Sequence, residues 1–320
     1  MEIDKLGKDE RYDLLTDIAD LYYNQGFTQS EIAKEFETTR FKIAKLLQEA
    51  RSEGAVEIHI NYSDQTDRTL ERRLEEKFSL NKAIVVNSQF TPYGEIMQKL
   101  GKAGASYLDQ IIQKNCRIGI TWGKTIYNVI NQLENPSRNQ AEIIQLTGSF
   151  LTPHSGTGAR GLVRKVASIY PGTHHYMDAP LYMSSEDLRN QMLEEPLLKS
   201  TLSATNTIDI ILTGVGSLSS LPLTNSLFTP YVSESDKTKV DDCIGSIYGY
   251  VLDKNGEIAD LDLNKKVIAT PLTNILKTPH RLVVAIGRHK TNVLYHVLRN
   301  RLANELLTDS ETATTLLEHY

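Results

Sequence analysis

The sequence predicts a small all-α domain followed by a larger α/β domain with a mostly parallel, doubly wound sheet. Two observations predict this fold class. The first sixty residues carry helical apolar patterns with helix-capping signals, and from residue 83 onward short β-branched runs alternate with longer amphipathic stretches. A length of 320 residues fits two domains of unequal size.

The composition is that of an ordinary globular protein, with 40% hydrophobic and 23% charged residues. No apolar run approaches the ~18 residues of a membrane helix, and the charged start of the chain is unlike a secretory signal. We therefore expect a cytoplasmic protein. The two cysteines, Cys116 and Cys243, have neither disulfide-framework nor zinc-site spacing, so we expect no metal and no cofactor.

The N-terminal region predicts three helices. An amphipathic helix covers residues 12–25. The second helix follows Thr28, because Thr28 and Glu31 have the spacing of a capping box, in which each side chain satisfies a backbone N–H group of the first turn. The third follows Thr39, which can cap it. Its apolar stripe, which we expect to face the core, consists of Ile43, Leu46, Leu47 and Ala50.

The third predicted helix is basic, although the whole chain carries a net charge of -5. Residues 38–51 contain four cations against the single anion Glu49. Two short helices joined by a tight turn, with cations on the first turns of the second helix, are typical of helix-turn-helix modules that enter the major groove of DNA. The residues that we expect at DNA are Thr28, Gln29, Thr39, Arg40, Phe41, Lys42 and Lys45.

An alternative is that these are ordinary amphipathic helices with solvated charges. We favour the DNA-binding interpretation, because the capping box, the small Ala33 at a helix crossing and the basic helix fall within one short window. One position departs from the usual pattern. The turn has Glu37 where glycine is common, so its backbone must bend there or the turn must be longer.

The polar stretch at residues 61–66 predicts a linker, which leaves residues 1–60 and 67–320 as the two domains. In the larger domain we expect strands at the apolar runs "AIVV", "RIGI", "EIIQL", "IDIIL", "LVVAI" and "ELLT". Near-continuous apolar strands joined by helices indicate a parallel sheet that is covered on both faces. In such sheets ligands bind beyond the carboxyl ends of the strands.

Polar, glycine-containing segments follow four of these runs: "TWGKT" (121–125), "TGSF" (147–150), "TGVGS" (213–217) and "GRHK" (287–290). An isolated glycine usually marks only a turn, but four such strand ends favour a shared ligand site. "TWGKT" is not a P-loop, because the first glycine of that motif would fall at Ile118. Gly123, Thr125 and the start of the next helix still suit an anion such as phosphate, and Lys290 would supply the opposite charge.

Other polar residues leave alternatives open. Asp253 precedes an Asn-Gly turn, so its carboxylate either satisfies its own hairpin or binds sugar hydroxyls. His174 and His175 are expected in a polar loop. Trp122, the only tryptophan, packs in the core or beside a ligand, and we favour the core. No Asp/His/Glu constellation appears at the strand ends, so we expect no catalytic residues.

Taken together, the two halves resemble the SorC/DeoR family of bacterial sugar-responsive transcription regulators over nearly the whole chain. The segments that carry the resemblance, in the order of the family, are "TQSEIAKEFETTRFKIAKLLQEAR", "IGITWGKT", "QLTGS", "DIILTGVGS", "GSIYGYVLDKNG", "IGRHK" and "LLTDSETATTLL". The resemblance implies a C-terminal domain similar to glucosamine-6-phosphate deaminase and ribose-5-phosphate isomerase that senses a phosphorylated sugar. It also implies assembly, commonly as a homotetramer, on paired operator half-sites.

The resemblance also implies the residues of the phosphosugar site. They are Gly123, Lys124, Thr125, Thr147, Gly148, Asp253 and Lys290, with Gly216 in the "TGVGS" segment. This chain has Ser149 and Ser246 where the family often has glycine and aspartate, and these departures bear on the identity of the sugar. We expect a DNA-binding regulator of a carbohydrate-utilisation operon, controlled by a phosphorylated sugar or sugar alcohol. The alternative is a sugar-phosphate isomerase or deaminase with a DNA-binding appendage.

Overall fold

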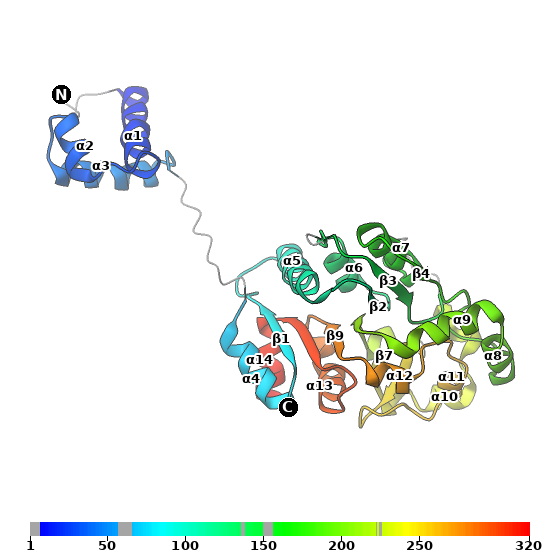
Figure 1. Cartoon of the computed structure of the whole chain (residues 1–320). Coiled ribbons are helices and arrows are strands. Elements are labelled where there is room, and N and C mark those ends of the chain that lie inside the picture. Colours follow the sequence, from blue (N-terminus) through cyan, green and yellow to red (C-terminus); the bar gives the residue numbers. More distant parts are fainter. Residues whose placement is uncertain (1–6, 57–65, 136–137, 150–155, 222, 224–225) are drawn as a thin grey trace. The chain divides into compact units, whose positions relative to one another are not determined.

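A computed structural model of the chain (Figure 1) describes residues 7–56, 66–135, 138–149, 156–221, 223 and 226–320. The chain divides into two compact units, Met1–Ser63 and Asp64–Tyr320. Residues 61–65 of the expected linker lie outside the described residues. In the described part of the chain, no helix is both long and apolar enough to cross a membrane.

Residues 7–56 of the N-terminal unit form helices α1 (Lys8–Tyr23), α2 (Gln29–Glu35) and α3 (Arg40–Ser52). Both expected caps are present, because the hydroxyl of Thr28 accepts a hydrogen bond from the N–H of Glu31 and that of Thr39 from the N–H of Lys42. The apolar stripe of α3 is buried against α1 and α2. The cluster contains Leu14, Leu15, Ile18, Ala19, Ile32, Ala33, Ile43, Leu46, Leu47 and Ala50.

The turn between α2 and α3 bends without a glycine. Glu37 has a φ of 47°, which few non-glycine residues adopt. The turn is closed by a hydrogen bond of 2.8 Å from the N–H of Thr38 to the carbonyl of Ala33. Glu37 therefore takes the bent conformation that its place in the turn requires.

The C-terminal unit is built on a seven-stranded parallel sheet of order β1-β10-β9-β5-β2-β3-β4. All six expected runs form strands, which confirms the doubly wound class. The strands are β1 (Lys82–Val86), β2 (Cys116–Ile120), β3 (Ala141–Gln145), β4 (His174–His175), β5 (Ile210–Thr213), β9 (His280–Val284) and β10 (Glu305–Asp309).

Helices cover both faces of this sheet (Figure 1). One core cluster holds α5 (Tyr93–Ile111), α6 (Lys124–Ile130) and α7 (Ala159–Ile169) against the sheet. The other holds α4 (Arg68–Phe78), α12 (Leu272–Lys277), α13 (Thr291–Arg299) and α14 (Ser310–His319). Successive residues of a strand point to opposite faces, so Ile84 and Val86 join the first cluster while Ala83 and Val85 join the second.

Two features differ from the expectations. His174 and His175, expected in a loop, form the edge strand β4 beside Ile143 and Ile144, and the ring of His175 lies 2.7 Å from the carboxylate of Glu142. A strand of two residues is too short for a periodic signal. The sequence also does not predict a second, antiparallel sheet of β6 (Val215–Ser217), β7 (Cys243–Ile247) and β8 (Tyr250–Asp253).

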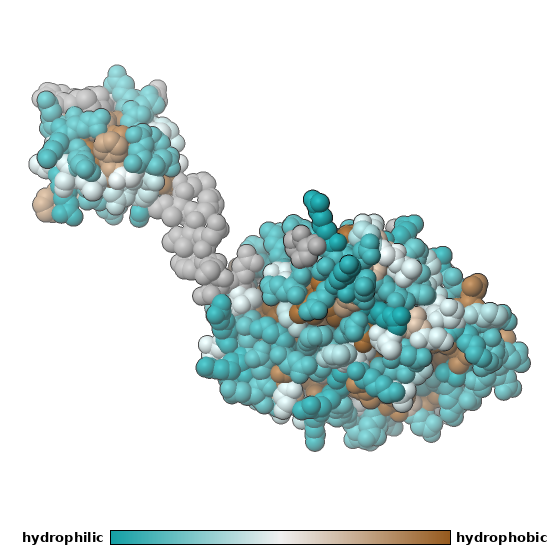
Figure 2. Space-filling model, in the orientation of Figure 1, coloured by the Kyte–Doolittle hydropathy of each residue, from teal (hydrophilic) through white to brown (hydrophobic). Residues whose placement is uncertain are grey.

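The other described α-helices of this unit, α8 (Glu186–Leu193), α9 (Pro196–Ala204), α10 (Glu234–Thr238) and α11 (Asp262–Lys265), lie in connections between strands. Short 3₁₀ turns include Leu218–Ser220, Ser226–Tyr231 and Arg288–Lys290. On the face drawn in Figure 2, hydrophilic side chains cover most of each unit, and the hydrophobic areas are small and scattered.

Candidate functional site

A cavity of about 430 Å³ lies beyond the carboxyl ends of β2 and β5. From β2 the chain proceeds outward to β3 and β4, whereas from β5 it proceeds the other way to β9 and β10. The two strands therefore flank the topological switch point of the sheet, where ligands bind in open α/β folds. Five expected ligand-site residues line the cavity, namely Gly123, Lys124, Thr125, Gly216 and Lys290.

The "TWGKT" loop is held by hydrogen bonds on both sides. The N–H of Thr121 donates to the carbonyl of Leu212, and its hydroxyl lies 3.1 Å from that of Thr213. Gly123 has a φ of 141°, and its N–H donates to the carbonyl of Thr157. That N–H is therefore occupied, contrary to the expectation that it would be open to an anion. Helix α6 begins at Lys124 without a side-chain cap, which leaves the amides of its first turn available.

The hydroxyl of Thr125 serves the protein rather than the cavity. It donates a hydrogen bond of 3.2 Å to the buried carbonyl of Val284 in β9. The expectation that this hydroxyl would donate to a phosphate is not met in this arrangement, because its one proton is used. Thr125 instead fixes the first turn of α6 against the sheet.

Two lysines give the cavity its positive charge. Lys290 ends the 3₁₀ turn that leads into α13 and is half-buried, and burial lowers the pKa of its ammonium group. No hydrogen bond or ion pair joins that ammonium group to any residue within the described ranges. Lys124 is exposed, with its Nζ 5.8 Å from the centroid of the Tyr93 ring at the same cavity.

Aromatic and aliphatic side chains form much of the remaining wall. Trp122 lines the cavity, as do Tyr182 and Phe228, whose rings meet edge to face with centroids 5.6 Å apart. Tyr182 donates its hydroxyl to the carbonyl of Gly249, and complete burial raises its pKa. Trp122 thus lines the cavity and is also partly buried against the core cluster of the second sheet.

Three expected ligand-site residues do not line this cavity. Thr147 is buried, and its hydroxyl has no hydrogen-bond partner among the described residues. Gly148 lines a different pocket. The carboxylate of Asp253 accepts hydrogen bonds from the N–H groups of Asn255 and Glu257, so it is occupied by its own turn, the alternative that the sequence left open.

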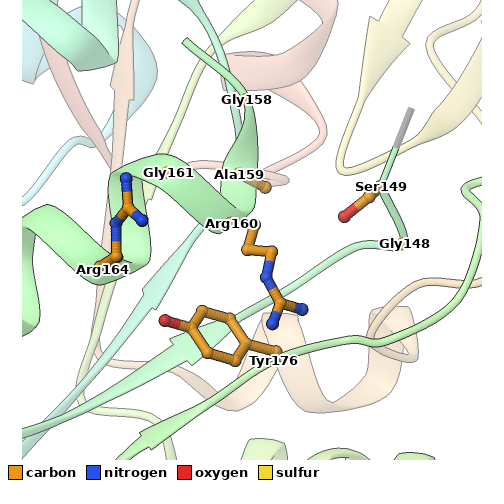
Figure 3. Close-up of a pocket in the computed structure, with 8 residues that line it drawn as sticks. All are labelled: Gly148, Ser149, Gly158, Ala159, Arg160, Gly161, Arg164 and Tyr176. Carbon is orange, nitrogen blue, oxygen red and sulfur yellow. The ribbon is translucent and has the colours of Figure 1, made fainter. Parts of the chain in front are cut away.

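The pocket at Gly148 has a volume of about 330 Å³ and is shown in Figure 3. Arg160 extends from α7 toward the ring of Tyr176, and its guanidinium carbon lies 4.1 Å from the ring centroid. Arg160 also pairs with Asp178. Its charge is therefore partly neutralised by an exposed ion pair, whereas Lys290 in the first cavity has no such partner among the described residues.

The sequence does not identify Tyr182, Phe228 and Ser246 as cavity residues. Tyr182 and Phe228 come from connections without helical or strand periodicity, so no local pattern places them. Ser246 lies on β7 beside Gly216 of β6, and an added Cβ on Gly216 would stand 2.6 Å from its hydroxyl. The resemblance singles out Ser246, but only as a departure from aspartate.

The residues expected at DNA lie at or near the starts of α2 and α3. Arg40, Phe41 and Lys45 are exposed on α3, and Phe41 keeps 88% of its surface accessible. Thr28 and Thr39 use their hydroxyls as caps, as described above. Gln29 and Lys42 are half-buried. Within the described ranges, no group of three or more His, Cys, Asp or Glu side chains could hold a metal ion.

Comparison with known proteins identifies the family of this chain. Residues 64–318 match the family model described as "Putative sugar-binding domain". The chain is also 28% identical over 309 residues to the sorbitol operon regulator of Klebsiella pneumoniae, covering 95% of this chain and 98% of that relative. The chain belongs to the SorC/DeoR family of sugar-responsive transcriptional regulators.

Other SorC/DeoR relatives agree over the same length. The deoxyribonucleoside regulator of Bacillus subtilis (strain 168) is 25% identical, covering 96% of this chain and 98% of the relative. The crystal structure of full-length SorC from Klebsiella pneumoniae superposes with a TM-score of 0.71 at 26% identity, covering 96% of this chain and 98% of that one.

A transcriptional regulator from Streptococcus pneumoniae TIGR4 shares the fold, with a TM-score of 0.71 at 23% identity over 78% of this chain and 96% of that one. The expectation of a SorC/DeoR regulator is confirmed, and these likenesses decide against the isomerase or deaminase alternative.

Proposed function

We propose that this SorC/DeoR regulator binds operator DNA of a carbohydrate-utilisation operon and that a phosphorylated sugar or sugar alcohol in the cavity changes its operator affinity. Residues 1–60 would bind DNA, residues 61–66 would link, and residues 67–320 would hold the effector and assemble the protein. The names of the relatives, a sorbitol operon regulator and a deoxyribonucleoside regulator, favour a carbohydrate effector.

The observation that carries the phosphorylated effector is the Lys290 ammonium group at a cavity beside the uncapped start of α6. A half-buried cation without a protein partner loses hydration and gains nothing in return, which is why burial lowers its pKa. A phosphate between Lys290 and the first-turn amides would restore that loss through charge-assisted hydrogen bonds. The volume of about 430 Å³ lies within the usual range for small-ligand sites.

The lining also favours an anion by what it lacks. Among the described residues at the cavity there is no Asp and no Glu, so none of these side chains would repel a phosphate. Lys124 at the same cavity adds a second positive charge. A neutral sugar would leave both ammonium groups without a counter-charge. These facts favour a phosphorylated form over the free sugar.

The start of α3 is the proposed DNA contact. Its exposed Arg40 and Lys45 can reach phosphates and base edges, and Thr39 orders the first turn by capping it. A dimer that reads a two-fold symmetric operator would place half-sites about 34–36 Å apart or at multiples of that spacing. The resemblance to the family implies a homotetramer. We infer a cytoplasmic location because operator DNA is available there.

The proposal is tested by selecting a duplex from a randomised pool with the full-length protein and measuring its binding by fluorescence anisotropy. Lys45→Glu should weaken operator binding and reduce the salt slope by about one. Lys277→Glu, an equal charge change at an exposed position in α12, should leave both unchanged. Phosphorylated sugars should change operator affinity about 5- to 150-fold. An equal response to the unphosphorylated sugars would contradict the phosphate part of the proposal.

A further inference from the structure

Phe90, in the connection between β1 and α5, combines full exposure with an unusual backbone conformation. Its side chain is 100% exposed, and its φ is 55°. A bulky residue seldom adopts a positive φ, because its Cβ then crowds the backbone. Phe90 is the third residue of a turn closed by a hydrogen bond of 3.2 Å from the N–H of Thr91 to the carbonyl of Ser88. Glycine or asparagine is usual at such a position, so the turn holds an apolar ring in water at a cost to the fold.

The other aromatic residue with a positive φ in the described part of the chain shows how such a cost is normally offset. Tyr248 has a φ of 56°, but its side chain is buried and its hydroxyl donates a hydrogen bond of 2.9 Å to the carbonyl of Leu302. The fully exposed ring of Phe90 has no comparable packing. Strained residues are concentrated at ligand clamps and switch regions. The strain at Phe90 therefore suits a contact that forms only in a bound state.

The base of the turn is fixed to the start of α14, so only its tip projects. The N–H of Ser88 donates to the hydroxyl of Ser310 at 3.0 Å, and the hydroxyl of Ser88 accepts from the N–H of Glu311 at 3.3 Å. Gln89 and Phe90 at the tip are both exposed. An anchored base with an uncovered tip allows the tip to move while β1 stays in place.

The start of α14 also supports the turn that carries Lys290. The N–H of Gly287 donates to the hydroxyl of Thr312 in α14 at 2.8 Å. The N–H of Lys290 donates in turn to the carbonyl of Gly287 at 3.0 Å, and Lys290 lines the cavity. The turn of Phe90 and the turn of the buried cation therefore share one support.

The chain that follows Phe90 leads directly to the cavity. Tyr93, three residues further on, lines it with an exposed ring, and the Nζ of Lys124 lies 5.8 Å from the centroid of that ring. Three residues of chain span at most about 11 Å. The backbone of Phe90 therefore lies within that distance of a wall residue, and its ring can extend toward the mouth of the cavity.

We infer that Phe90 completes the effector site, with its turn closing over the cavity and its ring packing against the carbon skeleton of the bound effector. This inference rests on the proposed function and adds a ligand-binding residue to it. Burial of the ring removes apolar surface from water, which favours closure. A turn that leaves a strained φ on closing also regains free energy. Closure excludes water and so strengthens the attraction between Lys290 and a phosphate.

Phe90 variants test this inference, and Trp122 at the cavity gives a fluorescence readout. The full-length protein is titrated with glucose 6-phosphate, fructose 6-phosphate, ribose 5-phosphate and sorbitol 6-phosphate. Inorganic phosphate, which has no carbon skeleton, serves as the control ligand. Phe90→Asn removes the ring and tolerates a positive φ. This variant should bind each sugar phosphate that binds wild type about tenfold more weakly, through faster dissociation, and should bind inorganic phosphate as wild type does.

The melting temperature separates this effect from damage to the fold. Without ligand, Phe90→Asn should melt roughly 2–4 °C higher than wild type, because asparagine relieves the strain. Phe90→Tyr retains an aromatic ring and should bind as wild type does. Leu197→Asn removes a different exposed apolar side chain, on α9, and should change no ligand affinity. Weaker binding by a more stable variant, with Phe90→Tyr unaffected, would support a direct contact of the ring.

Two results with Phe90→Asn would overturn the inference. Sugar phosphates that bind this variant as tightly as wild type would exclude the contact, and a changed sedimentation coefficient would then assign Phe90 to contacts between copies of the chain. An equal loss of affinity for inorganic phosphate would place the effect at Lys290 rather than at the ring. Absence of binding by every sugar phosphate in wild type would contradict the phosphorylated effector itself, and this inference would fall with it.

Discussion

The guanidinium of Arg11 in α1 forms a two-pronged ion pair with the carboxylate of Glu49 in α3, with Nε–Oε1 at 2.6 Å and Nη2–Oε2 at 2.9 Å. Glu49 is the only anion among the cations of residues 38–51. The pair therefore joins two helices and also neutralises the one negative charge of α3. Both effects favour DNA binding by this helix.

Removal of Arg11 separates these two effects. Arg11→Ala should destabilise the N-terminal unit by about 1 kcal/mol and weaken operator binding, because the freed carboxylate repels phosphates. In the double variant with Glu49→Gln, operator binding should recover while the stability remains low. Thermal melts and anisotropy of the four combinations give the coupling energy. Unchanged operator binding in Arg11→Ala would show that the charge of Glu49 does not reach DNA.

We predict that the ring of Phe41 contacts a thymine methyl group of the operator. Its ring is 88% exposed beside Arg40 at the start of α3, and apolar side chains at this place contact the 5-methyl group of thymine in the major groove. Replacing one thymine of the operator by uracil removes only that methyl group. Wild type should then bind this operator about fourfold more weakly, equivalent to ~0.8 kcal/mol for one buried methylene-sized group. The affinity of Phe41→Ala should not change. An equal loss of operator affinity in wild type and in Phe41→Ala would exclude Phe41 as the residue that contacts this methyl group.

We predict that the hydroxyl of Thr125 contributes more to the free energy of unfolding than to effector affinity. Thr125→Val keeps the shape of the side chain but removes the donor to the carbonyl of Val284, which should cost about 1 kcal/mol of unfolding free energy. Thr125→Ser retains the hydroxyl and should be close to wild type. Effector affinity should fall only modestly in Thr125→Val. A large loss of affinity without a loss of melting temperature would indicate that the hydroxyl binds the effector directly.

We predict that effector binding depends on pH through the ammonium group of Lys290. Burial lowers its pKa in the free protein, and a phosphate dianion binds better to the charged ammonium. Effector affinity should therefore be full at pH values below this lowered pKa and should fall as the pH rises through it. Calorimetry above about pH 7 avoids the second ionisation of a phosphate ester near pH 6. Lys290→Met should bind more weakly, with little pH dependence, and a wild-type slope in that variant would assign the titration to another group.

Local signals predicted much of this fold. The strands were identifiable because a strand buried on both faces is apolar at successive positions, as in Ala83–Val86 of β1. Thr28 and Thr39 were identifiable as caps because a helix start leaves N–H groups that a nearby hydroxyl can accept from. Both features depend on neighbours within a few residues.

The site was only partly predictable, because its remaining features depend on distant contacts. The hydroxyl of Thr125 donates to the carbonyl of Val284, and no spacing in the sequence indicates this hydrogen bond. Tyr182 reaches the cavity from a connection between strands and Phe228 from a short 3₁₀ turn, and their rings meet there. Thr147 and Gly148 follow β3 as expected, but the chain turns at Gly148 to pair with Ile268 and does not border the cavity.

The coupling between effector and operator is tested most directly by the operator affinity of Lys290→Met, measured with and without a phosphorylated effector that acts on wild type. Wild type should change its affinity about 5- to 150-fold when the effector is added. Lys290→Met should bind the operator as wild type does without effector and should show no change at concentrations that saturate wild type. A Lys290→Met protein that responds to the effector as wild type does would contradict a phosphate site at Lys290.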